Sequence, residues 1–189
     1  MVLQPTELKP SGKEAHAGTE MGAVHLKVSD LERSTSYYTE VLGLSVLNRY
    51  AGLARLTADG VHPLILLEQI PEALALPPGR HSGLYHFALL VPSRRDLGNA
   101  LKHLIGRQVR LGSSDHGVSE ALYLSDPDGI GIEIYRDRDR SEWTYLPGGQ
   151  VFMKTDPLDA AGLGKRRKGS GRDFPSERGS ATSTFTSAT

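Results

Sequence analysis

Residues 114–133 have the sequence SDHGVSEALYLSDPDGIGIE, and this stretch decides the fold of the chain. Apolar and polar residues alternate around Tyr123, which is typical of a half-buried strand. Asp126-Pro127-Asp128-Gly129 is a strong turn signal, and the apolar run from Ile130 to Tyr135 follows it. The stretch therefore predicts a β-hairpin. That hairpin carries three chemically useful side chains: His116, Tyr123 and Glu133.

Glu133 lies inside the apolar run of the second predicted strand. Burying an unpaired carboxylate is costly, because a charge loses its hydration in an apolar environment. We therefore expect Glu133 either to meet a cation or a metal ion, or to point to water.

Composition sets wide limits on function. The chain has 189 residues and 38% hydrophobic residues, enough for one domain, with or without a tail. No apolar run reaches transmembrane length and the start lacks a secretory signal, so we expect a cytoplasmic protein without a membrane partner. The absence of cysteine leaves His, Asp and Glu as metal ligands. A net charge of zero gives no electrostatic case for nucleic acid.

A weak internal repeat extends from Met21 to Arg136. Each half predicts a strand, a helix and three further strands. The first half opens with MGAVHLKVSD and the second with GLYHFALLVPS, which places His25 and His86 at equivalent positions. In the first half, Ser29 and Glu32 form a capping-box pattern at the start of the helix. The strands after the two helices are predicted at 44–50, 53–57 and 64–68, and at 109–113, 120–125 and 130–135.

The repeat resembles the vicinal oxygen chelate superfamily over roughly residues 20–145, with His25, His86 and Glu133 at the matching positions. The resemblance implies an α+β fold in which two paired βαβββ modules form an incomplete barrel around a metal site. The opening stretch is similar to the extradiol ring-cleavage dioxygenase pattern, although Ser114 departs from it. Within the superfamily, the chain resembles the N-terminal half of catechol 2,3-dioxygenase-like proteins. The matching positions are His116, Leu122, Tyr123, Asp126, Pro127, Gly129 and Glu133.

This resemblance implies a metal-dependent enzyme. His25, His86 and Glu133 are the expected ligands, with Fe(II) preferred and Mn(II), Ni(II) or Zn(II) acceptable to the same donors. Two imidazoles and one carboxylate leave adjacent positions open for a catechol-type aromatic substrate and dioxygen. By the same resemblance, His62 is expected to move protons, while Tyr123 and His116 form hydrogen bonds near the substrate.

Two other classes stay open. A glyoxalase I-like lyase or isomerase uses a fourth ligand, for which Glu68 is the candidate. Aligning Asp59-Gly60 with Asp128-Gly129 pairs His62 with Gly131 and places Glu68 four residues beyond the equivalent of Glu133. The last class is a non-catalytic small-molecule-binding module, or an inactive truncated half.

The ends of the chain differ in composition from its middle. We expect a flexible leader at 1–19, the domain at 20–145 with modules at about 20–70 and 80–138, and a disordered tail at 146–189. One admissible coding of residues 179–189, shifted by two bases, yields a peptide close to Met21–Asp30, so we hypothesise a frameshift-derived end. A half built to pack against another exposes apolar surface, which makes a homodimer an expected arrangement.

Overall fold

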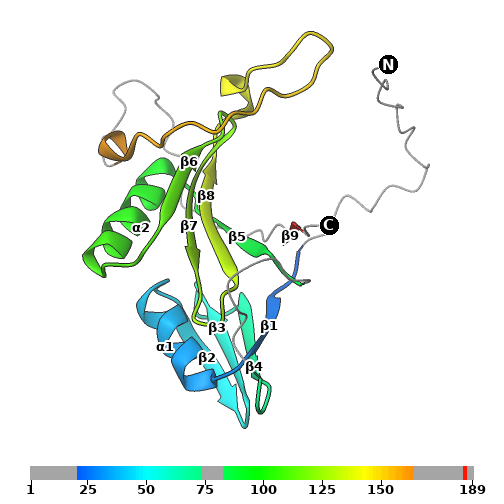
Figure 1. Ribbon diagram of the computed structural model, residues 1–189, viewed down its shortest axis with the longest axis vertical. Coiled ribbons are helices and arrows are strands. Elements are labelled where there is room, and N and C mark those ends of the chain that lie inside the picture. The colour runs from blue at the N-terminus through cyan, green and yellow to red at the C-terminus, as the bar shows by residue number, and fades with distance from the viewer. Residues whose placement is uncertain (1–20, 74–82, 164–184, 187–189) are drawn as a thin grey trace, which may run out of the picture.

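The computed structural model describes residues 21–73, 83–163 and 185–186. Two modules follow one another, each with the predicted order of strand, helix and three strands (Figure 1). The first contains β1 (Val24–Val28), α1 (Leu31–Glu40), β2 (Ser45–Tyr50), β3 (Leu53–Thr57) and β4 (Ile65–Gln69). The second contains β5 (His86–Leu90), α2 (Arg94–Gly106), β6 (Gly112–Asp115), β7 (Ser119–Ser125) and β8 (Gly131–Asp137). The short elements are η1 (Arg140–Glu142), η2 (Ala160–Gly162) and β9 (Phe185–Thr186).

The strands form two mixed sheets, and neither closes into a barrel. Their orders are β1-β4-β3-β2 and β6-β7-β8-β5-β9. In each module the first strand runs parallel to the last, β1 with β4 and β5 with β8, and the remaining pairs of the module are antiparallel. The predicted α+β fold of two βαβββ modules is therefore confirmed.

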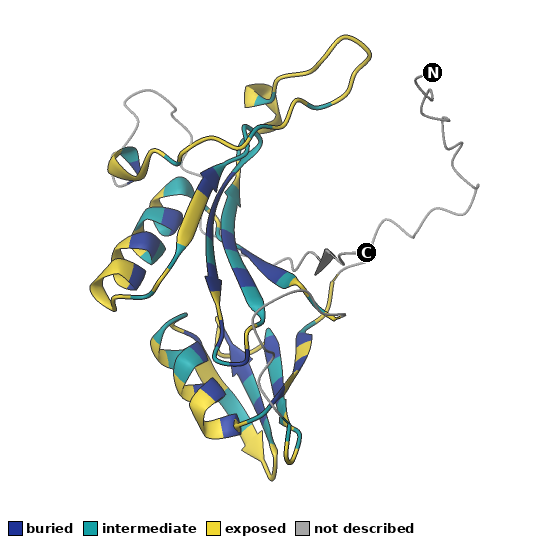
Figure 2. Ribbon diagram, viewed as in Figure 1, coloured by how far each residue is buried: buried dark blue, intermediate teal, exposed yellow. Residues whose placement is uncertain are grey.

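Each sheet packs its helix against one face. The side chains on the opposite face are not covered by that helix. In β1 the residues alternate between buried and exposed, with Val24, Leu26 and Val28 buried while His25 is exposed. Successive side chains of a strand point to opposite faces, so the apolar set packs into the core and the histidine faces away. Figure 2 shows the buried positions along both sheets and on the adjoining helices.

The helix starts differ in part from the capping prediction. Ser93 caps α2, because its hydroxyl accepts from the Asp96 N–H at 3.2 Å. For α1 the cap is Asp30, which accepts from the Arg33 N–H at 2.9 Å. Ser29 instead binds Asp128 of the β7–β8 turn, with its N–H 3.0 Å from the carboxylate. The capping box at Ser29 was therefore wrong: the serine serves a distant contact, and the neighbouring Asp takes the cap.

The β7–β8 turn joins the two modules. Asp126 accepts from the Ile130 N–H at 2.8 Å, which closes the turn, and from the Tyr38 hydroxyl of α1 at 3.0 Å. Burial raises the pKa of Asp126, and burial together with the Asp126 charge raises the pKa of Tyr38. Asp128 pairs with Arg33 at 2.6 Å. The Asp-Pro-Asp-Gly signal thus makes a turn and also fixes one module against the other.

The register of the two modules corrects the predicted position of Glu68. His25 lies opposite Leu66 across β1 and β4, while His86 lies opposite Gly131 across β5 and β8. Leu66 is therefore equivalent to Gly131, and Glu68 is equivalent to Glu133. The predicted four-residue mismatch arose because residues 61–64 form an extra excursion in the first loop before β4 begins at Ile65.

The stretch after β8, residues 138–163, is here called the arm. An antiparallel bridge joins Tyr145 to Val151 within the arm, and a second joins Asp156 of the arm to Asp115 of β6. Leu163, at the end of the arm, is buried in the core. The predicted disordered tail at 146–189 is thus corrected for residues 146–163, because core burial and backbone pairing order this part. The rest of that prediction, apart from β9, and the predicted leader at 1–19 lie outside the described residues.

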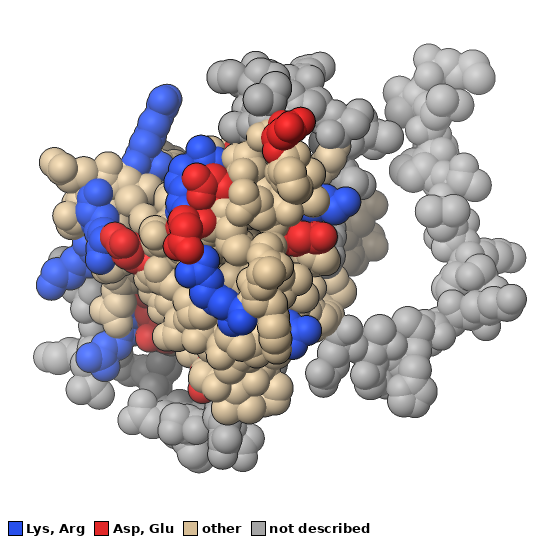
Figure 3. Space-filling model, turned by 90° about the horizontal axis from the view of Figure 1, so that it is seen from below, with Lys and Arg blue, Asp and Glu red and all other residues tan. Residues whose placement is uncertain are grey.

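The surface is of mixed charge. On the face shown in Figure 3, basic and acidic side chains lie interspersed, so this face presents no large field of one sign. None of the described helices is long and apolar enough to cross a membrane.

Candidate active site on the strands of the second module

Two of the three predicted metal ligands lie together. His86 on β5 and Glu133 on the neighbouring strand β8 approach to 3.3 Å between Nε2 and Oε2. Their side chains are only 18% and 15% exposed. Gly131 makes this approach possible, because a Cβ there would lie 2.6 Å from the Tyr85 carbonyl oxygen and 2.8 Å from the His86 Cβ. The glycine between two isoleucines is therefore required by the histidine beside it.

Tyr123 extends the pair. It lies directly opposite Glu133 in the β7–β8 ladder, and its hydroxyl donates to Glu133 Oε1 at 3.1 Å. Burial, together with the charge of Glu133, raises the pKa of Tyr123. The phenol therefore stays protonated near neutral pH and acts as a hydrogen-bond donor rather than as a base.

His116 completes a continuous row of contacts. Its Nε2 lies 2.7 Å from the Tyr123 hydroxyl, and its Nδ1 lies 3.0 Å from the Lys154 carbonyl oxygen. The row thus runs from the arm through His116, Tyr123 and Glu133 to His86. A single phenolic proton faces acceptors on both sides, so a proton on His116 or on Glu133 decides which way the phenol donates.

His25 lies in an equivalent pair in the first module. Its Nε2 is 2.9 Å from Glu68 Oε2, and the two side chains are 49% and 40% exposed. The offset is the same in both modules, since Lys27 faces Glu68 as Ala88 faces Glu133. Each module therefore contains the same kind of His–Glu pair. The side chains of the pair are partly exposed in the first module and largely buried in the second.

His62 lies on the excursion before β4, and its side chain is 82% exposed. Its Nδ1 is 2.8 Å from Asp59 Oδ2, and this hydrogen bond holds the pKa of Asp59 below its usual range. No hydrogen bond or ion pair found among the described residues links His62 to His86 or Glu133. The structure thus places His62 apart from the other predicted catalytic residues.

The donor pairs fit a metal ion in part. Two ligands at right angles around an octahedral ion, each about 2.1 Å from it, lie about 3 Å apart. The His86–Glu133 separation of 3.3 Å and the His25–Glu68 separation of 2.9 Å match that spacing. Within residues 21–73 and 83–163, no three such side chains form a group that could hold a metal ion. The structure thus brings together pairs of predicted ligands, and His25 does not join His86 and Glu133.

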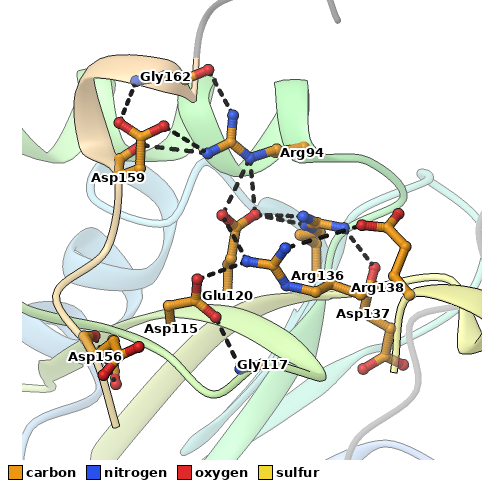
Figure 4. Close-up of polar contacts among 12 residues, drawn as sticks. Arg94, Asp115, Gly117, Glu120, Arg136, Asp137, Arg138, Asp156, Asp159 and Gly162 are labelled. Carbon is orange, nitrogen blue, oxygen red and sulfur yellow. Dashed lines mark hydrogen bonds and ion pairs between the residues drawn. The ribbon is translucent and has the colours of Figure 1, made fainter. Parts of the chain in front are cut away.

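A buried charge cluster behind the site was not predicted. Glu120 on β7 binds Arg94 of α2 at 2.9 Å and Arg136 of β8 at 2.6 Å (Figure 4). Although burial alone would raise the pKa of Glu120, hydrogen bonds from these two arginines lower it. Arg138 also reaches Glu120, at 3.4 Å, and pairs with Asp115 at 2.6 Å. The sequence carried one sign of this cluster. Glu120 stands at the start of an apolar strand, and Arg136 and Arg138 lie two residues apart at the end of the strand that pairs with it.

A small apolar cleft lies elsewhere, between the end of α1 and one side of α2. Its volume is about 240 Å³. It is lined by Val41, Leu42, Gly43, Asn99, Ala100, His103, Leu104 and Ile134. None of the predicted site residues lines it, so the chemistry of the site is separate from this cleft.

Comparison with known proteins agrees with the fold. Residues 20–134 match the model of the Glyoxalase/Bleomycin resistance protein/Dioxygenase superfamily. The chain is 48% identical over 148 residues to a catechol-2,3-dioxygenase of Bacillus subtilis (strain 168), which covers 78% of this chain and 52% of that protein. It is 30% identical over 115 residues to biphenyl-2,3-diol 1,2-dioxygenase 2 of Rhodococcus globerulus, covering 60% of each. The chain therefore spans between half and two thirds of the length of these relatives.

Solved structures support the same architecture. A glyoxylase/bleomycin resistance protein/dioxygenase domain from Frankia sp. EAN1pec superposes with a TM-score of 0.54 at 24% identity, covering 64% of this chain and 98% of that one. A glyoxalase/dioxygenase from Nostoc punctiforme also gives 0.54, at 20% identity, covering 74% and 98%. At these identities the likeness concerns the fold alone.

Proposed function

The chain belongs to the Glyoxalase/Bleomycin resistance protein/Dioxygenase superfamily, and on that premise we propose that it acts as an Fe(II)-dependent extradiol-type dioxygenase on a catechol-like aromatic. The single observation that carries this proposal is the row of contacts that links His116, Tyr123, Glu133 and His86. The 48% identity to a catechol-2,3-dioxygenase supports the same reaction class.

The proposed metal ligands are His86, Glu133 and His25. The first two are already paired, and His25 is included because it occupies on β1 the position that His86 occupies on β5. When bound, Fe(II) with such ligands supplies adjacent open positions for a catecholate and dioxygen. Mn(II), Ni(II) and Zn(II) suit the same donors, and elemental analysis of the purified protein identifies the bound ion.

The residues around the His86–Glu133 pair position it and are proposed to transfer protons. Tyr123 donates to one oxygen of Glu133, which leaves the other oxygen directed to His86. His116 lies at the end of the row, with its Nε2 2.7 Å from the Tyr123 hydroxyl. The proton-moving role that the sequence assigned to His62 therefore suits His116 better, because His62 is exposed and engaged with Asp59.

A second candidate function is a glyoxalase I-like lyase or isomerase. One observation favours it: Glu68 and Glu133 occupy equivalent registers, each paired with a histidine of the neighbouring strand. In this candidate the two pairs, which the structure does not bring into one group, would together supply four ligands: His25, Glu68, His86 and Glu133. The two candidates differ in whether Glu68 is needed to bind the metal.

Ring cleavage and metal binding separate the candidates. The protein, loaded anaerobically with Fe(II), is mixed with catechol in air, and the expected result is a yellow ring-cleavage product. Glu133→Gln should abolish the product and lower metal affinity at least tenfold, whereas Glu68→Gln should leave both near wild type. Glu72→Gln is the matched exposed control. No product together with metal binding that requires Glu68 supports the lyase instead, and wild-type metal content in the Glu133 variant rejects both candidates.

A further inference from the structure

The segment 152–156 of the arm, here called the strap, pairs with the end of β6 and with the residue that follows it. The Asp115 N–H donates to the Asp156 carbonyl at 2.9 Å, and the Asp156 N–H donates back at 3.0 Å. Farther along, the Lys154 N–H donates to the His116 carbonyl at 3.2 Å. The strap backbone is thus hydrogen bonded to Asp115 and to His116 itself.

The ring of His116 also faces the strap. Its Nδ1 lies 3.0 Å from the Lys154 carbonyl oxygen, and a carbonyl oxygen only accepts hydrogen bonds. Nδ1 must therefore carry a proton for this bond to exist, and in the neutral ring Nε2 then holds the lone pair. That Nε2 is the nitrogen that lies 2.7 Å from the Tyr123 hydroxyl.

We propose that the strap is a positioning element for the active site: the Lys154 carbonyl holds His116 in the Nδ1–H form, so that the lone pair of Nε2 is directed at the Tyr123 hydroxyl. A ring nitrogen fixed by a backbone carbonyl is a common way to set the tautomer and orientation of a functional histidine. The catalytic meaning of this contact rests on the proposed function, but the tautomer itself does not.

The strap is held in place from outside the site. Downstream, Leu163 is buried, and it packs so close to α2 that a Cβ on Gly98 would lie 2.8 Å from the Leu163 carbonyl oxygen. Arg94 donates to the Gly162 carbonyl at 2.6 Å, which fixes the same end. These residues lie beyond residues 20–134, the part that matches the family model, except for those of α2. The positioning is therefore a feature of the arm of this chain.

The tautomer can be measured without any catalytic activity. Long-range ¹H–¹⁵N correlation spectra of the histidine rings, recorded about two pH units above the ordinary pKa of 6.5, distinguish Nδ1–H from Nε2–H. A His116→Gln spectrum assigns the signal. His103 is an internal reference of the opposite form, because its Nε2 lies 3.1 Å from the Glu40 carbonyl oxygen. We expect His116 as Nδ1–H and His103 as Nε2–H.

Two variants test the strap as the cause. Asp156→Pro removes the N–H that donates to Asp115 and should release the strap, lowering the Nδ1–H to Nε2–H ratio of His116 by roughly fivefold or more, which is the factor supplied by one net hydrogen bond. Lys154→Met is the matched control, because it removes the ion pair between Lys154 and Asp156 at 2.6 Å and keeps the backbone carbonyl. The ratio should not change in the control or at His103.

The outcomes are distinct. His116 found as Nε2–H in the wild type overturns the proposal, as does an unchanged ratio when the 154–155 amide is replaced by an ester, which weakens the Lys154 carbonyl as an acceptor. That ester variant also replaces Asp156→Pro if the proline variant fails to fold. The expected tautomer in a protein that does not cleave catechol supports the strap and rejects the dioxygenase function, so the two failures are distinguishable.

Discussion

Replacing Glu120 by Gln should destabilise the protein by about 3 kcal/mol, because it leaves buried arginine charge without its partner. The Glu120 side chain is only 2% exposed and binds three arginines. Arg138 keeps Asp115 in the variant, and Arg94 keeps the Gly162 carbonyl. Among the described residues, Arg136, 11% exposed, keeps a hydrogen bond to the Asp137 carbonyl at 3.1 Å and the nearby Asp137 charge, but no ion pair within 4 Å. One arginine rather than three is therefore orphaned, which places the cost at the lower end of the range of about 3–5 kcal/mol for breaking a buried pair.

Urea unfolding at pH 7, followed by circular dichroism, measures this cost from the change in midpoint at constant slope. Glu32→Gln is the matched control: its carboxylate pairs with Arg49 at 2.6 Å but is 76% exposed, so the expected loss is about 0.5 kcal/mol or less. A loss below about 1 kcal/mol for Glu120→Gln would refute the inference that the cluster holds α2 and β7 to β8.

The difference in unfolding free energy between the wild type and Glu120→Gln should also depend on pH, which gives an independent check. The pKa of Glu120 is lower in the folded than in the unfolded protein, so its contribution is complete above the ordinary pKa of about 4.3 and is lost as pH falls through the folded pKa. The wild type should therefore lose its advantage over Glu120→Gln only below about pH 4.3. A difference that grows on acidification contradicts the assignment.

Three further substitutions test the site and the arm. Tyr123→Phe should lower kcat for catechol cleavage by roughly tenfold to a hundredfold with little change in metal content, because it removes the donor to Glu133; equal kcat values would exclude Tyr123 from the reaction. Gly131→Ala should cost about 1–3 kcal/mol in urea unfolding and reduce metal affinity, since its Cβ collides with His86; unchanged values contradict the packing argument. Leu163→Ala should cost about 2–4 kcal/mol, and a loss under about 0.5 kcal/mol would mean that the end of the arm is not part of the core.

Much of the fold follows from local pattern. The strand predicted at 53–57 has the observed bounds of β3, and the strand predicted at 120–125 begins at Ser119. These segments alternate clearly and end at strong turns, and both features depend on nearby residues alone. Ser29 was assigned as a helix cap for the same local reason, but its partner Asp128 lies 99 positions away, beyond any pattern of neighbouring residues.

The register of Glu68 could not be predicted by aligning the two halves of the sequence. Matching the two Asp-Gly turns assumed loops of equal length, whereas residues 61–64 are additional in the first module. The backbone hydrogen bonds of β1 with β4 set the true register, and they place Glu68 level with Glu133. Register depends on pairing between strands, so it cannot be counted along one strand.

The sequence by itself determined the two βαβββ modules, the hairpin with Tyr123 and Glu133, and the equivalence of His25 and His86, because periodicity and turn residues act over a few positions. Only the tertiary structure decided which side chains meet. It joined His86 to Glu133, gave His25 to Glu68, left His62 in water and brought the Lys154 carbonyl to His116. These outcomes depend on strand register and on the return of the arm across β6, which are long-range packing choices that local sequence does not encode.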